Sequence, residues 1–202
     1  FNGLGLEVDA ELELVTKRES SVRLGKQLNI NNESPLNITL LQGISRGERM
    51  DYALQKAVEL GVSRVIPVVT ERCNVQLSGG RSDKRLAHWQ SVVHAACEQS
   101  GRAVVPQITT PTSLNKWLAN HPQNNIARIL LNPIGTVRLA KLVKPNGEIQ
   151  LLIGAEGGLS PNEIDMARTN GFQSVILGPR ILRTETAALA AIASMQAVWG
   201  DF

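Results

Sequence analysis

The chain has 202 residues, of which 43% are hydrophobic and 19% are charged, and its formal net charge is +3 at pH 7. It can bury a core of one large or two small domains. We find no signal peptide, no long apolar run and no CxxC pattern around Cys73 and Cys97, so we expect no membrane span, disulfide scaffold or metal site and a reduced, cytoplasmic setting. The small positive excess permits a polyanionic partner without requiring one.

The first 34 residues have the pattern of a small β-domain. Apolar and polar residues alternate from Glu7 to Val15, as in a half-buried antiparallel strand, and Ser21 to Leu24 is its expected partner. The segment from Asn29 to Pro35 is rich in Asn, Ser and Pro, which is typical of a linker. We therefore expect one domain at 1–34 and a second at 35–202. The chain starts at Phe1 in mid-pattern, so we also expect that an N-terminal piece is missing.

From Leu36 the pattern changes to strands separated by helices, which predicts an α/β fold with a parallel sheet and helices on both faces. Short apolar runs predict strands at Ile38–Leu41, Val65–Val69 and Ile129–Leu131. Helical periodicity predicts helices at Glu48–Leu60, Ser82–Gln99 and Thr112–Leu118. The buried faces of the first two helices are expected to be Met50, Ala53, Leu54, Ala57 and Val58, and Leu86, Trp89, Val93 and Ala96.

The stretch from Leu151 to Ala191 carries the strongest signals. A buried strand at 149–153 ends in Gly154-Ala155-Glu156-Gly157-Gly158, a type of sequence that lets a backbone approach a ligand closely. Ordinary tight turning is an equally good account of the glycine spacing alone. A capping box at Ser160 predicts a helix at 161–170 with Gly171 after it.

A second buried strand is expected at 174–177, ended by Gly178-Pro179. The charged segment from Arg180 to Thr186 predicts an ordered loop. It is followed by an almost wholly apolar helix at 187–199, which must be buried inside the domain or against another chain.

These residues resemble a known family. The blocks IGAEGGLS and LGPRILRTETAALAAI are similar to those of the 16S ribosomal RNA uridine-N3 methyltransferase family, RsmE, in the SPOUT superfamily. The likeness continues through SRGERMD, ELGV, ERC and ACEQSGR, at residues 45–51, 59–62, 71–73 and 96–102. One departure is Ala155, where the family usually has proline; this change is expected to alter loop stiffness more than chemistry.

The resemblance implies a C-terminal trefoil knot, a preceding PUA-like β-barrel that is truncated here and binds RNA, a homodimer, and S-adenosylmethionine as the methyl donor. The RNA substrate would be ribosomal RNA or the small ribosomal subunit. The cofactor would lie among three loops, those after Leu131, at Gly154–Gly158 and at Leu177–Ala187. The expected cofactor-binding residues are Leu131, Gly154, Ala155, Glu156, Gly157, Gly158, Leu177, Gly178, Ile181, Leu182, Thr184, Thr186 and Ala187.

Arg183 and Glu185 are the candidate catalytic residues. Methylation of N3 requires that the imide proton of uracil be removed. A guanidinium near the carbonyl groups can stabilise the developing anion, and a positioned carboxylate can accept the proton. We assign the first role to Arg183 and the second to Glu185; a solvated loop salt bridge is the alternative account of the pair.

Six further residues are candidates for RNA contacts. Arg46 and Arg49 stand at the start of a predicted helix, where the helix dipole favours anions. Contact with a phosphate group is therefore a better explanation for them than helix stabilisation. The others stand at element ends, where surface salt bridges are an equally good account. The six are Arg46, Arg49, Arg72, Glu98, Gln99 and Arg102.

Two other functions are alternatives to this one. A dinucleotide-binding oxidoreductase would need a GxGxxG turn after a strand, and the chain has none. A non-catalytic RNA-binding module on the same fold remains the alternative to an enzyme, and Ala155 is the only residue that hints at it.

Overall fold

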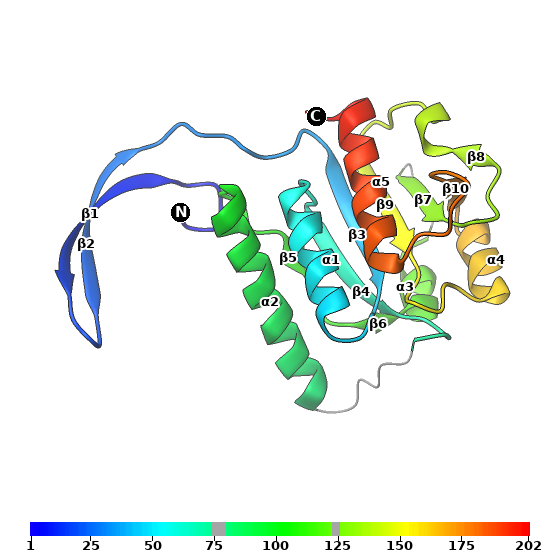
Figure 1. Cartoon of the computed structure of the whole chain (residues 1–202), viewed down its shortest axis with the longest axis horizontal. Helices are drawn as coiled ribbons and strands as arrows, with labels where there is room; N and C mark the ends of the chain where they lie inside the picture. The colour runs from blue at the N-terminus through cyan, green and yellow to red at the C-terminus, as the bar shows by residue number, and fades with distance from the viewer. Residues whose placement is uncertain (74–79, 123–125) are drawn as a thin grey trace.

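A parallel β-sheet forms the centre of the computed structural model, which describes residues 1–73, 80–122 and 126–202 (Figure 1). Over these residues the sheet has the strand order β5-β4-β3-β9-β7-β10-β8, with β6 paired to β4, and every pairing in it is parallel. The strands are β3 (Asn37–Gly43), β4 (Arg64–Val69), β5 (Gln107–Ile108), β6 (Thr112–Ser113), β7 (Ala127–Leu131), β8 (Val137–Arg138), β9 (Glu148–Ile153) and β10 (Gln173–Ile176).

Helices cover both faces of this sheet, as the sequence predicted. One face packs against α1 (Glu48–Glu59), α2 (Gly80–Ser100) and α5 (Thr184–Trp199), together with the short 3₁₀ helix η1 (Leu139–Lys141). The other packs against α3 (Leu114–Asn120) and α4 (Pro161–Thr169). The predicted inward residues of α1 are all buried, and so are three of the four predicted for α2. The central strands are buried on both faces, which explains their continuous apolar runs. None of the described helices has the length and apolar character needed to span a bilayer.

The capping box at the start of α4 is present as predicted. The Glu163 N–H donates to Oγ of Ser160 (3.1 Å), and the Ser160 N–H donates to Oε2 of Glu163 (2.9 Å). Gly171, which follows the C-cap, has a φ of +84°, a conformation that favours glycine. This local chemistry therefore determined where the helix begins and ends.

Several predicted boundaries differ from the structure by one to three residues, and two of the differences have a clear physical cause. The final helix begins at Thr184 rather than at Ala187, because Thr184 is buried and its hydroxyl bonds to Gly154 and Gln42; Glu185 then falls in the first helical turn, where the helix dipole favours a carboxylate. The helix predicted from Thr112 begins at Leu114, because Thr112 and Ser113 form β6 and Ser113 caps α3. In both cases a tertiary or terminal interaction decided the state of two or three residues.

Near the N-terminus the chain forms an antiparallel hairpin, β1 (Val8–Val15) and β2 (Ser20–Gln27), which stands away from the sheet (Figure 1). The expectation of a half-buried strand was wrong. The apolar face of the hairpin is exposed: the exposed fraction is 61% for Leu12 and 68% for Leu24. Alternation predicts which face is apolar, but burial depends on a second layer that covers that face.

Candidate active site

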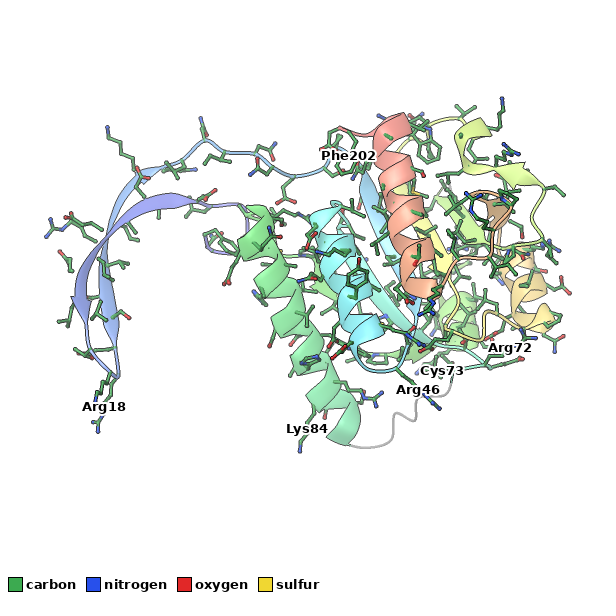
Figure 2. All side chains as sticks on the ribbon, in the orientation of Figure 1. Arg18, Arg46, Arg72, Cys73, Lys84 and Phe202 are labelled. Atoms are coloured by element: carbon green, nitrogen blue, oxygen red, sulfur yellow. The ribbon has the colours of Figure 1, made fainter. Side chains whose placement is uncertain are left out.

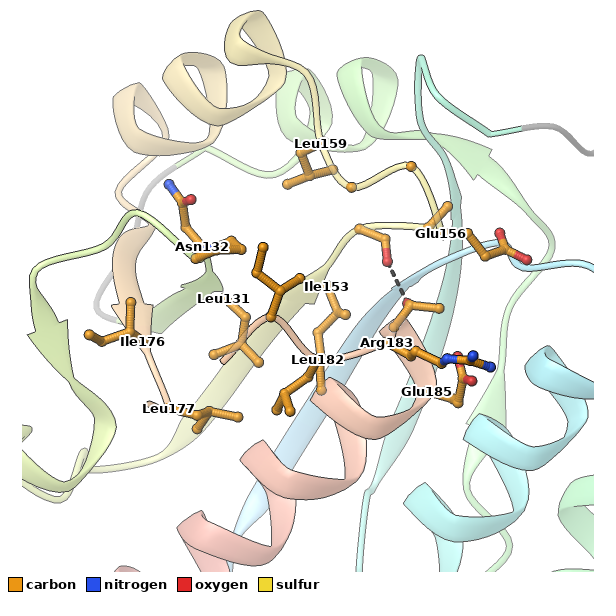
Figure 3. Close-up of a pocket in the computed structure, with 18 of the residues that line it drawn as sticks. Leu131, Asn132, Ile153, Glu156, Leu159, Ile176, Leu177, Leu182, Arg183 and Glu185 are labelled. Atoms are coloured by element: carbon orange, nitrogen blue, oxygen red, sulfur yellow. Dashed lines mark hydrogen bonds between the residues drawn. The ribbon is translucent and has the colours of Figure 1, made fainter. Parts of the chain in front are cut away.

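A cavity of about 670 Å³ opens at the carboxyl ends of β7, β9 and β10 (Figure 3). Three segments line it: residues 131–134 after β7, 153–159 at the end of β9, and 175–187 from β10 into α5. This is the edge of a parallel sheet at which ligands of α/β proteins bind. Its volume suits a ligand of the size of a nucleoside derivative.

The walls of the cavity are apolar and its rim is charged. Leu131, Ile153, Leu159, Leu177 and Leu182 supply aliphatic surface to it. Around them the lining includes four arginines and two glutamates, which are Arg49, Arg72, Arg180, Arg183, Glu156 and Glu185. An apolar slot with a mainly cationic rim suits a flat aromatic group inside and a polyanion outside.

The glycine loop after β9 folds tightly on itself. A Cβ placed on Gly154 would lie 2.8 Å from the Gly158 carbonyl carbon and 2.9 Å from the Leu159 nitrogen. The Gly158 N–H donates to the Ala155 carbonyl (2.8 Å), and Gly158 has a φ of +68°. Gly154 is therefore needed for the close approach of two backbone segments, and Gly158 for a left-handed turn. An ordinary tight turn does not require such a close approach at Gly154.

Thr184 joins the cavity loops to the sheet. Its hydroxyl donates to the Gly154 carbonyl (2.5 Å) and accepts from Nε2 of Gln42 at the end of β3 (2.9 Å). The hydroxyl is therefore used within the protein, although Thr184 lines the cavity. Gln42 was not predicted to belong to the site, although an amide among the apolar residues of a buried strand is a signal for such a role.

Glu156 ties the glycine loop to the start of α1. Its Oε1 accepts from the Arg46 N–H (2.9 Å) and lies 3.4 Å from Nη1 of Arg49. Burial acts to raise the pKa of Glu156, but the backbone N–H groups of Arg46 and Glu156 and the Arg49 charge together hold this pKa below its ordinary value. The carboxylate is thus ionised at neutral pH, and the link to α1 is lost as the pH falls through the lowered pKa.

Arg183 and Glu185 both line the cavity at the beginning of α5 (Figure 3). Among the described residues neither forms a salt bridge, so the alternative of a loop ion pair does not hold. Arg183 is exposed at the N-cap, whereas Oε2 of Glu185 is buried with no hydrogen-bond partner in the described part of the chain. An unpaired buried carboxylate oxygen is costly unless a ligand or proton meets it.

Twelve of the thirteen expected cofactor residues line this cavity, and Thr186 does not. The lining also includes residues that were not predicted to bind the cofactor, although the loop after Leu131 was expected to contribute to the site. They are Asn132, Pro133, Ile134, Ile153, Leu159, Ile164, Val175, Ile176 and Arg180.

Three of the six RNA candidates lie at the cavity rim. Arg49 and Arg72 line the cavity, and Arg46 is exposed next to Glu156. Arg46 and Arg72 lie along one edge of the molecule, far from Arg18 at the hairpin tip (Figure 2). A polyanion that follows this edge can therefore contact both arginines.

The other three candidates lie elsewhere. Arg102 is only 5% exposed: it donates to Glu33 through Nε (3.0 Å) and Nη2 (2.6 Å), and through Nη1 to the carbonyls of Val58 and Val62 (2.9 Å each). The prediction that Arg102 contacts RNA was wrong, because its guanidinium is buried and is used in an ion pair with Glu33 of the linker. Glu98 and Gln99 are exposed in the last turn of α2 and are not part of the cavity lining.

The comparisons with known proteins agree with one another. The family model described as an RNA methyltransferase domain matches residues 32–196. The ribosomal RNA small subunit methyltransferase E of Buchnera aphidicola subsp. Acyrthosiphon pisum is 35% identical and covers 100% of this chain and 79% of its own length. The protein of the same name from Bacillus subtilis is 29% identical, with 95% and 77% covered.

A solved structure is similar over the whole chain. The crystal structure of a ribosomal RNA small subunit methyltransferase E from Neisseria gonorrhoeae, bound to S-adenosyl methionine, has a TM-score of 0.94 and 44% identity. The match covers 100% of this chain and 83% of that one.

Proposed function

Because this chain belongs to the ribosomal RNA small subunit methyltransferase E family, we propose that it transfers the methyl group of S-adenosylmethionine to N3 of a uridine in 16S ribosomal RNA. The observation that supports the N3 assignment is the presence of both Arg183 and Glu185 in the lining of the cavity, with one carboxylate oxygen of Glu185 unpaired among the described residues. An imide presents carbonyl oxygens beside an N–H, so it suits one cationic donor and one carboxylate acceptor. The ribosomal RNA substrate supports a cytoplasmic location.

The cofactor fits the chemistry of the cavity. Leu131, Ile153, Leu177 and Leu182 form an aliphatic slot for the adenine ring, and the glycine loop brings backbone groups to its edge. S-adenosylmethionine supplies a methyl group on a sulfonium, which is electrophilic without help from the protein. The protein therefore has to position the two reactants and manage one proton.

Arg183 and Glu185 promote the removal of the N3 proton. The Arg183 guanidinium stabilises the negative charge that develops on the uracil carbonyl oxygens as N3 loses its proton. The unpaired Oε2 of Glu185 accepts that proton. Burial of this oxygen keeps water from competing for its lone pairs.

The RNA backbone lies along Arg46, Arg49 and Arg72 in this proposal. Charge supports this location, because residues 1–34 carry six carboxylates against four cationic side chains, and the positive excess therefore belongs to residues 35–202. The hairpin is then better suited to shape contacts than to phosphate binding.

The domain boundary near residue 34 and a PUA-like β-barrel are also proposals. The β1–β2 hairpin forms its own two-stranded sheet, separate from the central one. Its exposed apolar face, which includes Leu12 and Leu24, is what the inner surface of a barrel requires.

We also propose a trefoil knot in the C-terminal half. After β7 the chain passes to β8 on the outer side of β10 and then returns through η1 to β9, on the inner side of β7. Residues 132–147 thus run past β10 to its outer neighbour and back to the inner side of β7. The chain leaving β10 turns back to the centre of the sheet, where Thr184 binds Gly154, and these two paths support a threaded chain.

A homodimer is supported by the outer face of α5. One side of this helix is buried in the core, including Ala188, Ala191 and Met195, while Ala197 and Val198 are exposed. Figure 1 shows α5 and α1 side by side with no element over them in this view. An apolar helix with one uncovered side is typical of a subunit interface.

We expect Ala197→Glu to convert the dimer into a monomer, because a dimer would bury two carboxylates in its interface. Ala197 is exposed in the single chain, so the substitution should not disturb the core. Sedimentation velocity measures the result. Ala95→Glu places the same charge on an exposed site of α2 and serves as the control. A variant that sediments like the wild type would exclude this face of α5 from the interface.

Isothermal titration with S-adenosylmethionine tests the cofactor site. Gly178 lines the cavity and has nothing within 4 Å of the position a Cβ would take, so the site accepts substitution without strain. We expect Gly178→Trp to fill the cavity and weaken binding at least about 100-fold, whereas Gly178→Ala stays within about threefold of the wild type. No binding by the folded wild-type protein would favour an RNA-binding module without catalysis.

A further inference from the structure

The carboxylate of Glu163 does more than cap its own helix. This residue is 1% exposed, and Oε2 accepts the Ser160 N–H that closes the capping box. Among the described residues no salt bridge to it forms. A buried carboxylate without a cation needs hydrogen-bond donors for both of its oxygens, and the helix supplies a donor for only one.

The second oxygen reaches another part of the chain. Oε1 of Glu163 accepts the N–H of Glu71 at 2.8 Å. Glu71 lies just after β4, at the beginning of the connection toward α2. The N-terminus of α4, which follows directly on the glycine loop, is therefore tied to the segment that carries Arg72.

Arg72 makes the next contact between the same two segments. Its Nη1 donates to the Gly157 carbonyl at 3.1 Å, and a Cβ on Gly157 would lie 2.8 Å from the Arg72 Cβ. Adjacent residues of one segment thus contact the last part of the glycine loop, at Gly157, and the first turn of α4, at Glu163. With its backbone fixed at Glu71, Arg72 has its side chain directed to the cavity rim.

We infer that Glu163 is a positioning residue for RNA binding: it fixes the backbone at Glu71 and thereby places the Arg72 guanidinium at the mouth of the cofactor cavity. The inference rests on the proposed function, since Arg72 is assigned there to the RNA backbone. The same link makes the RNA contact depend on the conformation of the glycine loop. A cap that served α4 alone would affect stability and leave RNA binding unchanged.

A double-mutant cycle separates these two roles. We expect Arg72→Ala to raise KM for a 16S ribosomal RNA transcript about tenfold, with kcat within about twofold, and to lower the slope of log binding against log salt by about one. Glu163→Gln replaces an acceptor oxygen with a donor and should raise KM and lower the salt slope in the same way. The double variant should then be no worse than Arg72→Ala alone.

Ser160→Ala is the matched control. It removes the Oγ that accepts the Glu163 N–H, and so weakens the helix cap, but it leaves the Glu163–Glu71 link in place. We expect a lower Tm with KM for RNA within about twofold of the wild type. If Glu163→Gln does not fold, Glu71→Pro removes the N–H donor from the other end of the link and takes its place in the cycle.

Additive effects of Glu163→Gln and Arg72→Ala, or an equal rise of KM in Ser160→Ala, would overturn the inference. Failure of the proposed function has a different signature, which is a wild-type protein that transfers no methyl group to the transcript or to purified small subunits. In that case the cycle is measured on the Kd for the transcript. A wild type that binds no RNA overturns both.

Discussion

Arg183→Ala is expected to lower kcat for RNA methylation about 100- to 1,000-fold, because the developing uracil anion loses its preorganised cationic donor. The Kd for S-adenosylmethionine should stay within about threefold of the wild type, since the aliphatic slot and glycine loop are untouched. Single-turnover methyl transfer from tritiated cofactor measures the chemical step directly. Arg183→Lys keeps the charge without the planar fork and should recover only part of the rate.

Arg180→Ala is the control for this experiment. Arg180 is a neighbouring exposed arginine of the same cavity lining, so it tests whether any positive charge at the rim has the same effect. We expect a change in KM for RNA and little change in the chemical step. Equal losses of kcat in both variants would mean that general electrostatics, and not a contact at the reacting base, explains the effect.

Glu185→Gln is expected to lower kcat about 100-fold or more at neutral pH, because the amide cannot accept the N3 proton. The deficit should shrink as the pH rises. Without the carboxylate the reaction depends on uridine that has already lost its proton to solvent, and that fraction grows about tenfold per pH unit below the pKa of the imide. The measurement is the pH profile of single-turnover rates for the two proteins.

The control is Asp165→Asn, which neutralises an exposed carboxylate on α4. It should leave the pH profile unchanged. A Glu185→Gln deficit that is constant across pH would contradict a role as proton acceptor and would leave the carboxylate with a positioning role only.

Local signals predicted most of the secondary structure. The capping box of Ser160 and Glu163 and the left-handed Gly171 specified α4, and the period of Met50, Leu54 and Val58 specified the buried side of α1. These features depend on residues within one or two turns of each other. They could therefore be predicted from the chain alone.

The candidate site was predicted in part. Glycines after a strand indicated the cavity loop, because two backbone segments can approach this closely only where a residue has no Cβ. Arg102 was placed on RNA although it binds Glu33 and two carbonyls in the interior. An arginine at an element end has the same appearance in sequence whether it faces solvent or a buried carboxylate.

The sequence by itself therefore determined the longer strands and helices along the chain, the cap of α4 and the glycine loop after β9, since each depends on short-range backbone chemistry. Only the tertiary structure decided which face of the hairpin is exposed, that α5 begins at Thr184, and that Gln42 and Glu163 join segments distant in the chain. Long-range hydrogen bonds and burial depend on how layers meet in space. These long-range contacts cannot be predicted from the periodicity or spacing of residues within one segment.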